Sequence, residues 1–138
     1  MNESRLDLSK PIGECSTQEL LEALMLQRGR FNLFDAERVL HDLYANRNLW
    51  ISFFMGPQIV EDAEYCLNGL FRTLRSISYR WHADTLYVHA QDDDCVYPLV
   101  ELGKVWQCDD VEVFDRKRTG ELMGRYPAPS PVVVYWWD

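Results

Sequence analysis

Three consecutive basic residues, Arg116, Lys117 and Arg118, form the densest positive cluster in the sequence. Clustered guanidinium and ammonium groups can bind a phosphate or a nucleic-acid backbone. Here the cluster lies between two apolar runs, and it is followed by Gly120, a residue that readily adopts the positive φ of a tight turn. The spacing therefore favours a solvated hairpin tip over a phosphate clamp.

Carboxylates and thiols are a second source of chemistry. Three consecutive aspartates at 92–94 offer oxygen ligands for Ca²⁺ or Mg²⁺, but they do not match the spacing of an EF-hand loop. We therefore expect no metal site and no other cofactor. The cysteines lack a C-x-x-C pair and zinc-ligand spacing, so we expect free thiols in a reducing compartment. They are Cys15, Cys66, Cys95 and Cys108.

His89 is the histidine whose position best suits proton transfer. It lies in the β-rich run at 85–90, where a period of two puts it on the same face as Thr85 and Tyr87. Imidazole titrates near neutral pH and can move a proton in either direction. A surface histidine, or one at a dimer face, is the alternative that this position leaves open.

The first half of the sequence contains the helix signals. Ser16 and Glu19 form a capping box ahead of an apolar run that Gly29 ends, and Asp35 caps a second run. Pro57 suits the first position of a third helix. The expected elements are a helix over 17–28, a helix from Asp35 to the ANRN sequence, a strand at 49–54 and a helix from Pro57 to about residue 75.

The second half shows strand-like patterns. Residues 77–81 alternate apolar and polar types, and residues 96–108 are rich in Val and Trp, so we expect extended structure in both. The PAPSP sequence at 127–131 is typical of a stiff connector. The other expected strands are 85–90, the two arms 110–115 and 121–126 of the hairpin, and a buried strand at 132–137.

Composition and charge place the chain among globular proteins. Its 138 residues, 47% hydrophobic, are enough for a single domain, with residues 1–15 as a flexible N-terminal segment. No apolar stretch resembles a membrane span or a signal peptide, so we expect a cytoplasmic protein that binds no membrane. Helices followed by antiparallel strands predict an α+β fold.

The net charge is −8, and residues 81–138 hold 11 acidic against 5 basic residues. This balance argues against a nucleic-acid partner, because phosphate binding requires excess Lys and Arg. It permits a basic protein partner.

Four stretches resemble the nuclear transport factor 2-like superfamily, which includes SnoaL-like polyketide cyclases, ketosteroid isomerase and scytalone dehydratase. They are FNLFDAERVLHDLYANRNLWIS, GPQIVEDAEYCLNGLFRTL, ADTLYVHA and VEVFDRKRTGEL. The resemblance implies three N-terminal helices packed in the concavity of a curved antiparallel sheet, an α+β cone with an apolar pocket at one end. It also implies a homodimer formed through the outer face of the sheet.

The resemblance also implies site residues. Ser52 lies where ketosteroid-isomerase-like members carry a general base, so that mechanism is not expected here. His89 matches a pocket histidine and Asp110 an acid that hydrogen-bonds an oxyanion, although Asp110 also suits a solvated position at a strand edge. The expected pocket walls are Tyr44, Trp50, Tyr79 and Tyr87.

Two functions therefore remain open. The first is a protein with a pocket for a small apolar molecule, such as a cofactor-independent cyclase, isomerase or dehydratase that uses His89 and Asp110. The alternative is a non-catalytic acidic binding module, of the inhibitor or immunity type, that caps a basic protein partner.

Overall fold

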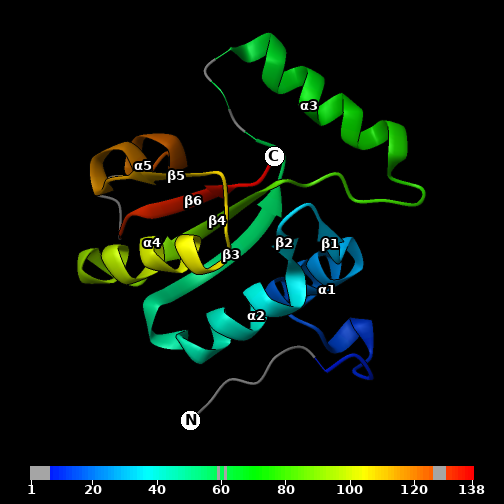
Figure 1. Cartoon of the computed structure of the whole chain (residues 1–138), viewed down its shortest axis with the longest axis horizontal. Coiled ribbons are helices and arrows are strands. Elements are labelled where there is room, and N and C mark those ends of the chain that lie inside the picture. Colours follow the sequence, from blue (N-terminus) through cyan, green and yellow to red (C-terminus); the bar gives the residue numbers. More distant parts are fainter. Residues whose placement is uncertain (1–6, 59, 61, 126–129) are drawn as a thin grey trace.

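The computed structural model describes residues 7–58, 60, 62–125 and 130–138, and these residues form an α+β fold with five α-helices and two antiparallel sheets (Figure 1). The helices are α1 (Thr17–Arg28), α2 (Ala36–Ala45), α3 (Ala63–Ser76), α4 (Val96–Val105) and α5 (Arg116–Met123). The strands are β1 (Arg30–Phe31), β2 (Phe34–Asp35), β3 (Trp50–Gly56), β4 (Thr85–Ala90), β5 (Asp110–Phe114) and β6 (Val132–Trp136). Among the described residues, no helix combines the length and the apolar character that crossing a membrane requires.

The larger sheet has four strands in the order β3-β4-β6-β5, and each strand is antiparallel to its neighbours. The last strand of the chain, β6, thus lies between β4 and β5, which run parallel to each other and are connected through α4. The sheet is not closed, and α3 stands apart from it (Figure 1). Of the three helices expected inside a cone, α3 therefore does not pack against the sheet.

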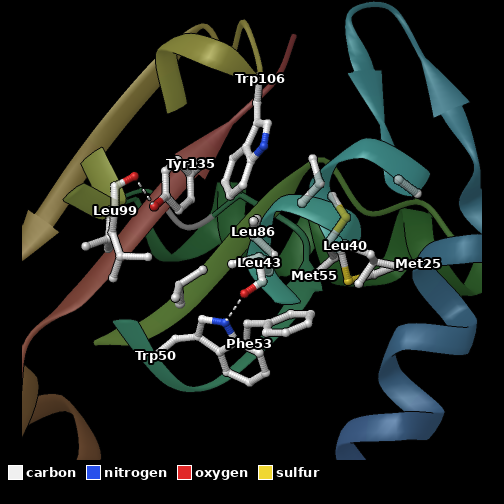
Figure 2. Close-up of a cluster of buried hydrophobic side chains, with 14 of the residues drawn as sticks. Met25, Leu40, Leu43, Trp50, Phe53, Met55, Leu86, Leu99, Trp106 and Tyr135 are labelled. Atoms are coloured by element: carbon white, nitrogen blue, oxygen red, sulfur yellow. Dashed lines mark hydrogen bonds between the residues drawn. The ribbon is translucent and has the colours of Figure 1, made fainter. Parts of the chain in front are cut away.

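The core lies on one face of this sheet, which we call the inner face, and it is filled with side chains from α1, α2 and α4 (Figure 2). Two buried polar groups are satisfied inside it: Trp50 Nε1 donates to the Leu43 carbonyl at 2.7 Å, and the Tyr135 hydroxyl donates to the Leu99 carbonyl at 2.6 Å. These bonds fix both large rings, because an unpaired buried donor costs free energy. Among the fully buried members are Met25, Leu40, Leu43, Leu86, Val88, Val133 and Trp137.

The helix signals in the first part of the chain are confirmed. The Ser16 side chain accepts from the Glu19 backbone N–H, and the Glu19 carboxylate accepts from the Ser16 N–H, so the capping box is complete. Gly29 ends α1 with a φ of 68°, a conformation that favours glycine. The Asp35 side chain caps α2. In the segment expected to be flexible, residues 7–15 are described, and Lys10 Nζ lies 3.1 Å from the Glu19 carboxylate.

Two expectations around α3 are wrong. The helix begins at Ala63 instead of Pro57, because the Asp62 side chain accepts from the N–H groups of Glu64 and Tyr65 and so fixes the start. Residues 77–81 do not form a strand. Residues 77–79 form a turn after α3 instead, in which the N–H groups of Tyr79 and Arg80 donate to the Ser76 carbonyl at 3.1 and 2.9 Å.

The segment 96–108, expected to be extended, contains α4. Pro98 falls in the first turn of this helix, where its missing N–H removes no helical hydrogen bond. Leu99 and Gly103 are buried where the helix packs on β6. Its Val-rich composition therefore reflects a helix that covers a sheet.

The expected hairpin at 110–126 is also wrong after its first arm. Residues from Arg116 form α5, because the Asp115 side chain accepts from the Arg118 N–H at 2.8 Å and caps a helix. The glycine that ends this segment is Gly124, with a φ of 66°, and Gly120 lies inside the helix. The basic cluster is thus the first turn of a helix, and Arg116 lies 2.8 Å from the Asp93 carboxylate.

Three expected strands and the free cysteines are confirmed, and the expected connector falls mostly outside the described residues. Strands at 49–54, 85–90 and 132–137 correspond to β3, β4 and β6. All four cysteines are free thiols, as predicted. Most of the proline-rich connector, at 127–129, lies outside the described residues.

Candidate functional site

Both residues of the predicted acid–base pair lie on the outer face of the four-stranded sheet, opposite to the core. His89 is paired with Val132 of β6, and Asp110 is paired with Trp136 of the same strand. Four residues of extended strand separate these two positions, which is about 13 Å along β6. His89 and Asp110 thus share a face but do not converge on one reacting atom.

The side chain of His89 is engaged with Ser130. Its Nε2 lies 2.9 Å from Ser130 Oγ, and the same hydroxyl donates to the Ala90 carbonyl at 2.5 Å. A hydroxyl has one proton to donate, so the network assigns the donor role to the His89 Nε2–H. A serine nucleophile requires the opposite direction, with the imidazole as acceptor. Burial lowers the pKa of His89, which favours the neutral ring and a structural bond to the buried Ser130.

Asp110 is exposed at the beginning of β5, which is an edge strand. The neighbouring Asp109 carboxylate accepts a hydrogen bond from the Asp138 backbone N–H at 2.7 Å. Among the described residues, Asp110 therefore lies in solvent and not in an apolar pocket.

Two of the predicted pocket walls are part of the packed interior. Trp50 is 1% exposed, and its indole is held by the Leu43 carbonyl. The Tyr44 hydroxyl donates to the buried Glu22 carboxylate at 2.6 Å, and the Tyr44 ring packs edge-on against Trp50 at a centroid distance of 5.4 Å. Both rings contribute to the core (Figure 2 shows Trp50).

The other two predicted walls lie elsewhere. Tyr79 is 81% exposed in the segment after α3. Tyr87 lies on the outer face, where it stacks on Phe54 at 4.9 Å and donates through its hydroxyl to the Pro57 carbonyl at 2.5 Å. The structure therefore does not bring the four aromatic residues together around one hollow.

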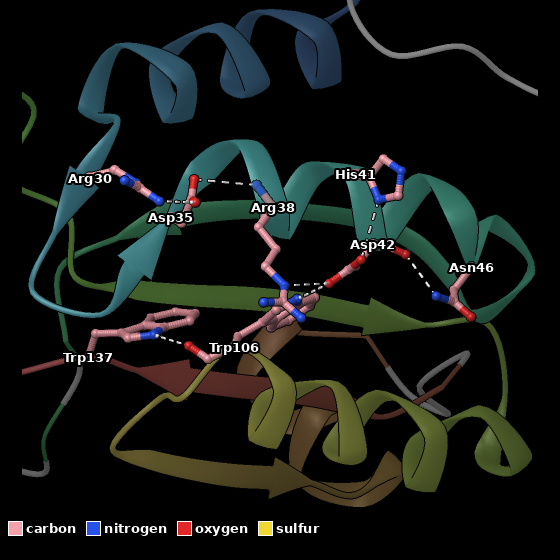
Figure 3. A network of polar contacts seen from close by, with 8 residues as sticks. All are labelled: Arg30, Asp35, Arg38, His41, Asp42, Asn46, Trp106 and Trp137. Carbon is pink, nitrogen blue, oxygen red and sulfur yellow. Dashed lines mark hydrogen bonds and ion pairs between the residues drawn. The ribbon is translucent and has the colours of Figure 1, made fainter.

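A cleft of about 310 Å³ opens between the β1–β2 hairpin, α2 and the C-terminal end of α4 (Figure 3). None of the predicted site residues lines it. The lining includes Arg30, Asn32, Asp35, Arg38, Val105, Trp106 and Gln107.

The charges around this cleft are internally balanced. Arg30 lies 2.7 Å from the Asp35 carboxylate, and this contact holds the pKa of Asp35 below its ordinary value. Arg38 lies 3.7 Å from the Asp42 carboxylate, which also accepts from Trp106 Nε1 at 2.9 Å. The cleft therefore offers a small polar molecule no uncompensated cation, and its lining contains no Ser, Cys or His that would act as nucleophile or base.

A surface that the sequence did not reveal lies on α3. Large apolar side chains recur at helical spacing along it, and each is between 48% and 65% exposed. We call this set, which includes the C-cap residue that follows the helix, the α3 stripe: Leu67, Leu70, Phe71, Leu74 and Ile77.

The opposite side of α3 is made of small residues, and this side contacts the rest of the chain. Cys66 Sγ donates to the Val60 carbonyl at 2.8 Å. A Cβ built on Gly69 would lie 3.8 Å from the Pro57 Cβ, which is ordinary contact. The helix thus packs its small side on its own connector and presents its large apolar side to solvent, the reverse of the usual amphipathic arrangement.

The period of α3 was readable from the sequence, but its orientation was not. An apolar stripe has the same pattern whether the chain's own sheet covers it or another molecule does. No sequence signal separates the two cases, and the expected cone places this helix against the chain's own sheet.

No family model, curated protein or solved structure matches this chain.

Proposed function

We propose that this chain is a non-catalytic binding module that recognises a protein through α3. The single observation that carries the proposal is the α3 stripe, in which five large apolar side chains of one helix and its C-cap are each about half exposed. Together they present on the order of 500 Å² of apolar surface, at the upper end of what a monomeric protein leaves in one patch. An amphipathic helix of this kind binds by laying its apolar side against an apolar surface of its partner.

The distribution of charge supports a partner with both basic and acidic regions. The chain carries −8, yet residues 65–83 contain three arginines and no acidic residue. The rest of the molecule, which we call the body, is therefore strongly acidic, whereas the second half of α3 is basic. The acidic body suits a basic surface, in line with an inhibitor or immunity-type module, and the Arg75 side of α3 suits an acidic one.

The catalytic alternative has less support from the geometry. His89 and Asp110 pair with residues of β6 that are four positions apart, and the Ser130 hydroxyl donates its hydrogen bond to the Ala90 carbonyl. The resemblance to the nuclear transport factor 2-like superfamily, with its cone and its cyclase, isomerase or dehydratase chemistry, stays a prediction from the sequence.

A photo-cross-linking experiment tests the proposal. A benzophenone amino acid replaces Phe71 in the α3 stripe, and in the matched control it replaces Tyr97, an aromatic residue of α4 that is 72% exposed. Irradiation in cells that contain the chain at its natural level is expected to give a discrete cross-linked protein band at position 71 and none at position 97. Mass spectrometry then identifies the partner. Equal, diffuse labelling at both positions would contradict the proposal.

A further inference from the structure

Among the described residues, two apolar surfaces are partly exposed, and they complement each other. One is the α3 stripe. The other is the middle row of the outer face, where Phe54, Tyr87 and Val134 are cross-strand neighbours on β3, β4 and β6, and the charged Glu112 follows at the edge on β5. Phe54 is 44% exposed, and Tyr87 and Val134 are half-buried. A sheet with one packed face ordinarily carries polar residues on the other face. An apolar row there therefore indicates that another surface packs on it.

We propose that the α3 stripe of one copy packs on the outer face of a second copy, and that the second copy returns the same contact. This inference rests on the proposed function and names its partner as another molecule of the same chain. The arrangement is a closed two-fold dimer, because each copy contributes one helix and one sheet face. Figure 1 shows α3 held away from the body, in a position to reach a neighbouring molecule.

The dimensions of the two surfaces agree. The 14 residues of α3 make a helix about 21 Å long at 1.5 Å per residue. Four strands spaced about 4.8 Å apart place the outermost strands about 14 Å from each other. The helix is therefore long enough to cross every strand of the partner's sheet, and the stripe contacts the middle row along its length.

Charge complementarity favours the same pairing. Arg75 follows Leu74 and lies one helical turn after Phe71, so it borders the α3 stripe. On the outer face, Asp110 and Glu112 are exposed along β5, at the edge of the apolar row. A helix whose second half is basic thus meets a sheet whose edge is acidic, and two chains that each carry −8 can associate without opposing like charges at this contact.

The buried area is what a stable dimer needs. One stripe of about 500 Å² against a similar area of sheet gives on the order of 1,000 Å² for one contact, the lower limit of a specific interface. Reciprocity doubles this figure to on the order of 2,000 Å², which lies within the range of stable complexes.

Contacts between α3 and the segment before it explain why the outer face is covered by α3 of a second molecule and not by the chain's own α3. Gly69 lies next to Pro57, and the Cys66 thiol donates a hydrogen bond to the Val60 carbonyl. The small side of the helix therefore already contacts the chain's own connector. Folding α3 back onto its own sheet would break these contacts. Binding in trans leaves them in place.

The first experiment measures molar mass by light scattering over a wide concentration range. The wild-type chain is expected at twice the mass of one chain, and the double variant Leu70→Glu/Leu74→Glu at the mass of one chain. Leu122→Glu is the matched control, because Leu122 is 59% exposed on α5 and Leu70 is 53% exposed on α3; this variant should remain dimeric. Circular dichroism checks that all three chains are folded.

The second experiment locates the contact. The variants Leu70→Cys and Val134→Cys are oxidised separately and after mixing. A disulfide-linked dimer that forms only in the mixture supports the proposal. A linked dimer from Leu70→Cys alone would mean helix-to-helix pairing. A third chain carries both Leu70→Cys and Val134→Cys, and an intramolecular disulfide in it would mean closure within one chain. Either result overturns the proposal. A wild-type chain that stays monomeric also overturns this inference. The proposed function then survives only if position 71 cross-links to a different protein.

Discussion

Replacing Gly103 by alanine is expected to destabilise the fold, although alanine is the better helix former. Gly103 lies in α4 and is buried where this helix packs on the sheet. A Cβ at this position would meet Val111 Cγ2 at 2.9 Å, Cys108 Sγ at 3.1 Å and Tyr135 Cδ2 at 3.1 Å. The Tyr135 ring is fully buried and its hydroxyl is bonded to the Leu99 carbonyl, so the ring cannot turn aside without losing that bond.

Two opposing effects set the magnitude. Alanine gains about 1 kcal/mol over glycine in a helix interior. Forcing an extra methyl into a packed interior costs about 1–3 kcal/mol, and three contacts at or below 3.1 Å place this site in the upper part of that range. We therefore expect Gly103→Ala to lower the free energy of unfolding by about 1–2 kcal/mol, which corresponds to a melting temperature several degrees lower.

Urea unfolding followed by tryptophan fluorescence measures this change, and Gly69→Ala provides the matched control. At Gly69, the added methyl meets one atom of the described residues, the Pro57 Cβ at 3.8 Å, so the helix gain is not opposed by overpacking there. That variant is expected to be as stable as the wild type or more stable, by up to about 1 kcal/mol. If Gly103→Ala were neutral or stabilising, the close packing of α4 on β5 and β6 would be refuted.

Two further predictions concern the sheet edge and alkaline pH. The Gln18 side chain makes the hydrogen bonds that a neighbouring strand would make with β3, because its Nε2 donates to the Phe53 carbonyl and its Oε1 accepts from the Phe53 N–H, both at 3.0 Å. Gln18→Leu should therefore lower the free energy of unfolding by about 1–3 kcal/mol. An unchanged urea midpoint would show that solvent replaces these hydrogen bonds. Burial raises the pKa of the Cys108 thiol from 9.0 to about 11, and burial likewise raises the pKa of Tyr135. The unfolded chain therefore loses these protons first, so the free energy of unfolding should fall as pH rises from 9 towards 11. The Cys108→Ala variant should show a smaller fall. Equal slopes of unfolding free energy against pH in the two chains would argue against the buried thiol as a cause.

Local signals in the sequence were sufficient to predict α1, α2 and the alternation of β4. The capping box at Ser16 and the Asp35 cap located α1 and α2. Alternation along 85–90 correctly put His89 on the face opposite to Leu86 and Val88, both of which are fully buried.

The failures have two causes, conflicting local signals and long-range packing. The Asp115 cap and the final Gly124 were present in the sequence, but the glycine inside α5 and its basic first turn are more typical of a loop. The Val-rich segment of α4 looked like a strand because a helix that covers a sheet is also apolar. The order of strands, with β6 between β4 and β5, has no local signal, and this order is what separates His89 from Asp110.

The molar mass of the purified wild-type chain in solution tests the central claim most directly, because the claim is that the α3 stripe is covered by another copy of the chain. Light scattering is expected to give twice the mass of one chain, falling to the monomer value when Leu70 and Leu74 are both replaced by glutamate. A wild-type mass of one chain at every concentration, unchanged by these substitutions, would contradict the reciprocal dimer.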